Sequence, residues 1–140
     1  MDKKIVPNEV FLEEAAQLLA EGREVSFTPL GSSMLPFIRG GRDTVTLRVL
    51  PHIETGDIVL ARLSGPRYVL HRVVDRNRSL LTLMGDGNLR GTESCTRDDI
   101  LGTVVAINGH KPTQGILWRT LRPFRRILLF VYRRIAGRKA

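Results

Sequence analysis

Short apolar segments separated by turn residues fill most of the chain between residues 24 and 107. Glycine pairs and Asn-Gly steps, such as Gly40-Gly41 and Asn108-Gly109, are typical of tight turns between strands. Because no helical pattern lies between these segments, we predict a mainly β fold, an antiparallel sheet or half-open barrel. The predicted strands are residues 24–28, 43–49, 57–63, 68–74, 80–84 and 102–107, with 68–74 and 80–84 forming a hairpin.

Helical patterns lie toward the two ends of the chain. Residues 8–21 predict an amphipathic helix with Asn8 as its N-cap and Gly22 as its stop. Residues 124–136 predict a second helix, which follows Pro123 and has arginines beside its apolar face. We therefore divide the chain into an N-terminal helix and lead-in (1–24), a β domain (25–110) and a basic amphipathic tail (111–140).

The composition fits a single domain, and we expect it to hold no metal or other cofactor. With 140 residues, of which 42% are hydrophobic, the chain can bury one sizeable core. The single cysteine, Cys95, excludes an internal disulfide and a metal site of several thiolates, and we expect neither a metal nor another cofactor. A nucleophilic Cys95 is a minor alternative to a packed thiol, since no cysteine-hydrolase signature surrounds it.

The basic charge is concentrated in the tail. All 14 Asp and Glu residues precede residue 111, whereas 9 of the 22 Lys and Arg residues follow residue 110. An Arg-rich amphipathic helix favours peripheral contact with an anionic membrane through residues 116–136. Nucleic acid is a less favoured partner, and docking of the apolar face on the protein's own core is a further alternative. The candidate anion-binding residues are Arg119, Arg122, Arg125, Arg126, Arg133 and Arg134.

The chain shows neither an export signal nor a membrane span. Its N-terminus leads into a charged helical pattern rather than an apolar signal segment. The longest apolar run, residues 127–132, is far shorter than the roughly 20 residues that cross a bilayer. We expect a cytoplasmic protein without an anchor, which the tail could bring to the inner membrane face.

A serine lies in a turn bounded by glycine and proline, Gly31-Ser32-Ser33-Met34-Leu35-Pro36. Glycine lets backbone approach a substrate closely, and proline restricts the turn. Ser33 could therefore act as a nucleophile, with backbone N–H groups facing the bound carbonyl. Gly31, Ser32, Met34 and Pro36 would line the substrate groove or the oxyanion site. An ordinary surface turn that carries two hydroxyls would have the same residues.

His71 is the candidate general base, because a neutral imidazole can accept a proton near pH 7. It lies within a predicted strand on the side of Val69 and Val73, where a core histidine would also fit, whereas His52 and His110 lie in turns. Asp86, in Gly85-Asp86-Gly87-Asn88, and Glu93 are the two carboxylates that could orient His71. Gly-Asp-Gly-Asn is equally good turn chemistry.

Taken in order, these segments resemble the type I signal peptidase superfamily, which includes the self-cleaving LexA-like repressors. The resemblance covers about residues 25–107 and rests on the Ser-Met-x-Pro box, the Val-Leu-His-Arg-Val-Val segment and the Gly-Asp box. It implies a mostly β fold and peptide-bond hydrolysis, with Ser33 as nucleophile and His71 where the endoplasmic-reticulum and archaeal members carry histidine. Asp86 corresponds to the Gly-Asp box aspartate, and Glu93 to the second acidic position. Gly31 replaces the second hydroxyl of many signal peptidases.

The function that this resemblance implies is a serine endopeptidase acting on a peptide or protein precursor through Ser33 and His71. The alternative is a non-catalytic module that uses the same groove to hold a peptide.

Overall fold

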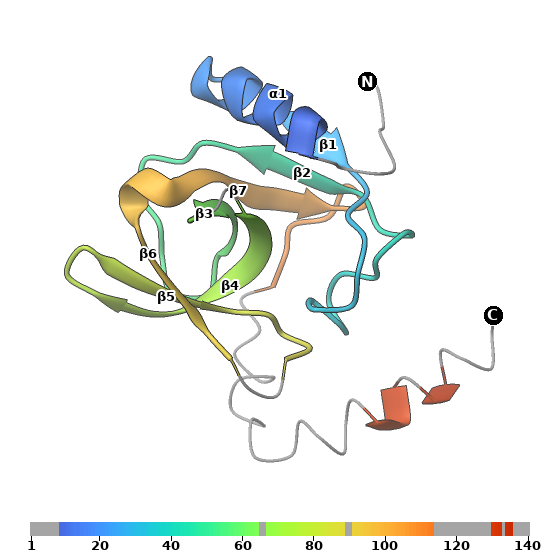
Figure 1. Ribbon diagram of the computed structural model, residues 1–140. Coiled ribbons are helices and arrows are strands. Elements are labelled where there is room, and N and C mark those ends of the chain that lie inside the picture. The colour runs from blue at the N-terminus through green and yellow to red at the C-terminus, as the bar shows by residue number, and fades with distance from the viewer. Residues whose placement is uncertain (1–8, 65–66, 89–90, 114–129, 133, 136–140) are drawn as a thin grey trace.

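The computed structural model describes residues 9–64, 67–88, 91–113, 130–132 and 134–135. Within these ranges seven strands form one sheet in the order β1-β2-β7-β3-β4-β5-β6, and every neighbouring pair is antiparallel. The sheet curls into a half-barrel with a helix against one side (Figure 1). The predicted mainly β, half-open architecture with an N-terminal helix is thus confirmed.

Each of the six predicted segments contains a strand. The hairpin of β4 and β5 forms as expected, although β4 continues through Asn77 and leaves only Arg78 and Ser79 in its turn. The prediction missed β6 and the short 3₁₀ helix η1 (Arg97–Asp99). β6 was missed because this four-residue edge strand has one buried side chain, Cys95, and therefore no clear alternation of polar and apolar residues. The strands are β1 (Val25–Phe27), β2 (Val45–Arg48), β3 (Ile58–Leu63), β4 (Arg67–Asn77), β5 (Leu80–Met84), β6 (Glu93–Thr96) and β7 (Ile100–Ile107).

The N-terminal helix α1 (Glu9–Ala20) packs its predicted apolar stripe on the sheet. Ala15 and Leu19 are buried, and the Phe11 ring meets Phe27 of β1 edge-on at a centroid distance of 5.6 Å. Gly22 ends the helix with φ +84°, a conformation that glycine adopts without steric cost. Because burial of these side chains depends on the sheet, α1 and the half-barrel form one packed unit.

Alternate residues of β3 serve two apolar clusters, one on each face of the curled sheet. Ile58 and Leu60 belong to the cluster that includes α1, whereas Val59 and Ala61 belong to the cluster with β5 and β6. Such a strand, apolar on both faces, explains why its segment is a continuous hydrophobic run in the sequence.

Most of the predicted basic tail lies outside the described residues, including Arg119, Arg122, Arg125, Arg126 and Arg133. The described part is helical at residues 130–132 and 134–135, where the Arg134 guanidinium lies over the Phe130 ring. In the part of the chain that the structure describes, no helix is long and apolar enough to cross a membrane.

Candidate functional site

The serine turn lies in the long loop of residues 28–44 between β1 and β2. Met34 and Ile38 are buried in the cluster under α1, and the Ile38 N–H donates to the Met34 carbonyl at 2.9 Å. Ser32 is exposed, whereas Ser33 is half-buried. The apolar anchors therefore fix the loop on the core while the two hydroxyls stay at the surface.

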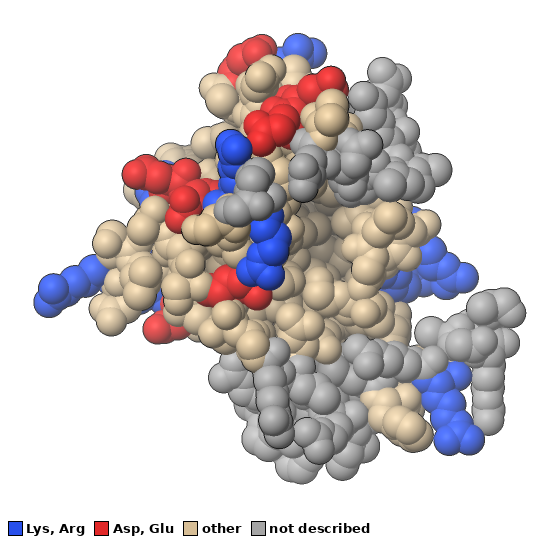
Figure 2. All heavy atoms as spheres, in the orientation of Figure 1, with Lys and Arg blue, Asp and Glu red and all other residues tan. Residues whose placement is uncertain are grey.

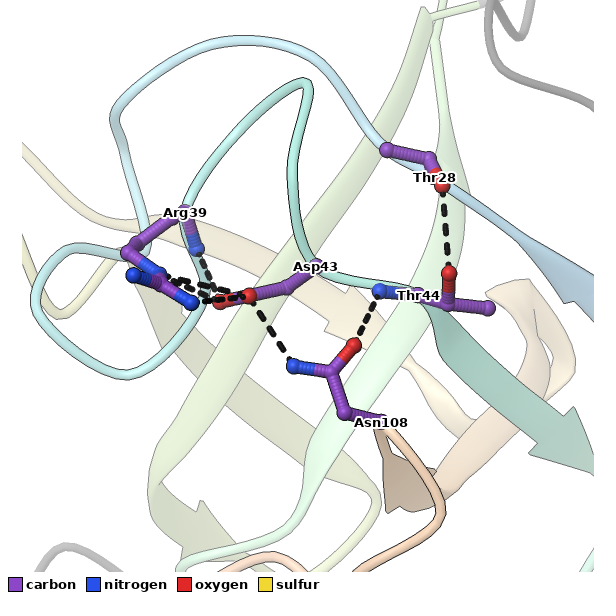
Figure 3. Close-up of polar contacts among 5 residues, drawn as sticks. All are labelled: Thr28, Arg39, Asp43, Thr44 and Asn108. Carbon is purple, nitrogen blue, oxygen red and sulfur yellow. Dashed lines mark hydrogen bonds and ion pairs between the residues drawn. The ribbon is translucent and has the colours of Figure 1, made fainter. Parts of the chain in front are cut away.

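Near the end of this loop, the buried carboxylate of Asp43 forms a network of hydrogen bonds (Figure 3). Asp43 accepts hydrogen bonds from the Arg39 backbone N–H at 2.7 Å, from Arg39 Nη2 at 2.9 Å and from Asn108 Nδ2 at 3.0 Å. The Thr44 N–H donates to Asn108 Oδ1 at 2.9 Å, and the Thr28 and Thr44 hydroxyls lie 3.3 Å apart. Burial acts to raise the pKa of Asp43, but the Arg39 and Asn108 donors outweigh it and lower that pKa.

The Gly-Asp box packs directly on the backbone of the serine turn. The Gly87 N–H donates to the Ser33 carbonyl at 2.8 Å. A Cβ on Gly85 would lie 2.3 Å from that same oxygen, and one on Gly87 would lie 2.6 Å from the Ser32 carbonyl oxygen. Only glycine permits this approach, so the turn that follows β5 determines where Ser33 lies.

The structure pairs His71 with Glu93. His71 Nδ1 and Glu93 Oε1 are 2.6 Å apart, and both side chains are largely buried. His71 directly precedes the first β4–β5 pair, Arg72 with Met84, and Glu93 lies opposite Leu83 in the register of β5 and β6. Because a carboxylate only accepts hydrogen bonds, this contact places a proton on Nδ1, so that in the neutral imidazole Nε2 carries the lone pair.

Asp86 instead forms a buried ion pair with Arg72, the residue after His71. Arg72 Nη2 lies 2.7 Å from Asp86 Oδ2, and both side chains are essentially inaccessible. Arg72 Nη1 also donates to the carbonyls of Gly56 at 2.7 Å and Thr113 at 2.9 Å. The pair thereby ties β4 to the Gly-Asp box, and of the two candidate acids it is Glu93 that contacts the imidazole.

Ser33 and His71 line one pocket of about 410 Å³. Its walls come from the serine loop, from α1, from β3 and from the first half of β4, with an apolar floor that includes Phe27, Met34 and Leu60. Within the described ranges the Ser33 hydroxyl forms no hydrogen bond to His71. Gly31 and Met34 line the same pocket, whereas Ser32 and Pro36 do not.

Two residues that organise this region escaped sequence reasoning. Arg72 and Asp43 look like surface charges in the sequence, yet they are 0% and 4% exposed. A charged residue inside an apolar strand, as Arg72 is, was the available signal. No sequence signal marked Asp43 as buried, because the fold alone brings its partners Arg39 and Asn108 together.

The remaining candidates lie apart from the pocket. His52 and His110 are exposed, as expected. Cys95 is buried in the second cluster, and this burial, with the Asp99 and Glu93 carboxylates, raises the pKa of its thiol to about 11. Since the thiolate is the nucleophilic form, Cys95 is unsuited to that role at neutral pH.

Comparison of the chain with protein-family models and with curated proteins finds no match.

Proposed function

We propose that this protein is a serine peptidase that cleaves a peptide or protein precursor, with Ser33 as nucleophile and His71 as general base. The observation that carries the proposal is the 2.6 Å contact between His71 Nδ1 and Glu93 beside a pocket that both His71 and Ser33 line. Ser33 and His71 line this pocket and Glu93 contacts His71, so three separate segments supply the required chemistry.

His71 Nε2 would take the Ser33 proton as the hydroxyl attacks the scissile carbonyl, and would return it to the leaving amine. Glu93 would hold the imidazole orientation and stabilise its charged form. The Ser33 N–H donates to no other described residue, so it is available to the developing oxyanion. Water activated by His71 would then release the acyl group.

The edge of β4 supports an extended peptide as substrate. Arg67–His71 pair with β3, but β5 begins to pair with β4 only at Arg72. No described strand covers the opposite edge of residues 67–71, and all five of these residues line the Ser33 pocket. A peptide added there as a strand would run along the pocket toward His71.

Labelling with a fluorophosphonate, a reagent that phosphonylates activated serines with loss of fluoride, tests the proposal. Ser33→Ala should abolish labelling of the full chain, whereas Ser32→Ala, the matched control one residue away, should leave it intact. His71→Ala should lower the labelling rate by at least about 10³-fold. Labelling that persists in Ser33→Ala, or that falls equally in both serine variants, would contradict this assignment.

A non-catalytic peptide-binding module is the second candidate, and the uncovered β4 edge beside an apolar pocket favours it. Binding of a panel of extended peptides, followed by fluorescence anisotropy, separates the two. A binder should keep its peptide affinity in Ser33→Ala and should leave the bound peptide intact in the wild-type chain. A peptidase should release two fragments.

We also propose that the tail contacts an anionic membrane surface. Phe130 and Ile135 are 62% and 54% exposed beside Arg134, which is the combination that interfacial helices present to lipid. Co-sedimentation with phosphatidylglycerol vesicles should fall on removal of residues 115–140. Equal sedimentation of the full and shortened chains would rule this contact out.

A further inference from the structure

Three arginines converge on a second pocket at the far end of the β4–β5 hairpin. Arg76 comes from the end of β4, Arg78 from the hairpin turn and Arg97 from η1. With Ser79, Ile53 and Leu81 they line a pocket of about 430 Å³. Five residues of extended strand separate Arg76 from His71, roughly 17 Å, so this pocket is distinct from the one beside Ser33.

Two of the arginines are held in place by backbone carbonyls. Arg76 Nη1 donates to the Ile53 carbonyl at 2.8 Å, and Arg97 Nη2 donates to the Pro51 carbonyl at 2.5 Å. Each contact uses one nitrogen of a guanidinium that has five N–H donors. The segment before β3 therefore positions both cations without neutralising their charge.

The three arginines of this pocket form no ion pair within the described residues. Arg39, Arg48, Arg62 and Arg72 each pair with an acid, but no ion pair joins Arg76, Arg78 or Arg97 to a described carboxylate. Asp99, the last residue of η1, accepts from Thr96 instead. Figure 2 shows basic side chains projecting at the left of the view, where Figure 1 has the hairpin tip.

Arg78 stands where the backbone favours another residue. Its φ of +57° lies in the left-handed region, which glycine and asparagine adopt more readily. Its side chain has no hydrogen bond or ion pair with another described residue, so nothing in that part of the fold accounts for an arginine here.

We propose that Arg76, Arg78, Arg97 and the Ser79 hydroxyl bind a phosphate group, either as free phosphate or as a small organic monoester. A dianion relieves the repulsion among three cations, and guanidinium forks match its oxygens. Ile53 and Leu81 give the pocket an apolar side that suits the carbon chain of a monoester. The volume admits a small metabolite.

Titration of the ¹⁵N-labelled full chain with glycerol 3-phosphate, inorganic phosphate and acetate tests this site. Saturable amide shifts at residues 76–79 and 97 are expected with both phosphates, and acetate should bind at least about tenfold more weakly because it carries one charge. Tighter binding of glycerol 3-phosphate assigns the monoester, and tighter binding of inorganic phosphate assigns the free ion. Shifts confined to other residues, or equal binding of acetate, would overturn the proposal.

Arg78→Gly separates binding from folding. The variant relaxes the turn, so its stability in urea should be equal to or above wild type, while phosphate affinity falls about tenfold through loss of a charge-assisted contact. Arg23→Gly, which removes an exposed arginine before β1, is the control for net charge and should leave affinity unchanged. Equal affinities for the two variants would refute the site.

Discussion

Replacing Gly85 with alanine tests the contact that holds Ser33 in position. The new Cβ would lie 2.3 Å from the Ser33 carbonyl oxygen and 3.1 Å from its carbonyl carbon, whereas ordinary contacts begin at 3.4 Å. Both neighbours are backbone atoms, so no side-chain rotation relieves the overlap. The serine turn would have to retreat by about 1 Å.

That retreat has a cost in stability and a cost in reaction rate. It would stretch the Gly87–Ser33 hydrogen bond beyond its 2.8 Å length, which removes about 1 kcal/mol, and the overpacking adds about 1–3 kcal/mol. We therefore expect a loss of about 2–4 kcal/mol in the free energy of unfolding. A displacement of about 1 Å at Ser33, the proposed nucleophile, should slow its labelling by the fluorophosphonate on the order of 10²-fold.

Urea unfolding and the rate of fluorophosphonate labelling measure the two effects. Gly102→Ala is the matched control, because its Cβ would meet the Leu19 side chain at 3.1 and 3.3 Å, so that the neighbour need shift by only a few tenths of an ångström. The control should lose less than about 1 kcal/mol and keep its labelling rate. If Gly85→Ala behaves like Gly102→Ala in both assays, the packing explanation is wrong.

Three further predictions follow from buried ionisable groups. Arg72→Met should lower the free energy of unfolding by about 3–5 kcal/mol by removing the buried cation that Asp86 contacts, and adding Asp86→Leu should restore much of the loss in urea unfolding. Because folding lowers the pKa of Asp43, the stability that its carboxylate contributes is present above the unfolded pKa and is lost as pH falls through the lower folded pKa. Below pH 5 the free energy of unfolding of the wild type should therefore fall more steeply than that of Asp43→Asn. Parallel pH curves for the two proteins would contradict this. With a thiol pKa of about 11 against 9.0 unperturbed, Cys95 should react with iodoacetamide at pH 8 at least about a hundredfold more slowly than in the denatured chain, and equal rates would show that it is not buried.

Local sequence patterns predicted most of the fold. The apolar segments and the turn residues between them are short-range signals, because a strand or a tight turn depends on a few neighbouring residues. Gly22 shows how local this information is, since its +84° φ follows from the end of one helix. The edge strand β6 was missed because its pairing with β5, rather than its own residues, makes it a strand.

The site was predictable only as a set of candidates. Ser33 and His71 stood out by residue type and context, but the choice between Asp86 and Glu93 needed coordinates. Both acids follow β5, and only the register of β4, β5 and β6 brings Glu93 to His71 while Asp86 meets Arg72. Sequence spacing carries no such register, because the turn after β5 determines it.

The sequence alone therefore determined the β architecture, the N-terminal helix and the list of candidate site residues, since these depend on periodicity, turn chemistry and residue type. The tertiary structure decided which acid contacts His71, how Gly85 and Gly87 position the serine turn, and that Arg76, Arg78 and Arg97 share one pocket. These are contacts between segments distant in the chain, and their energies depend on burial and close approach that only the folded chain creates.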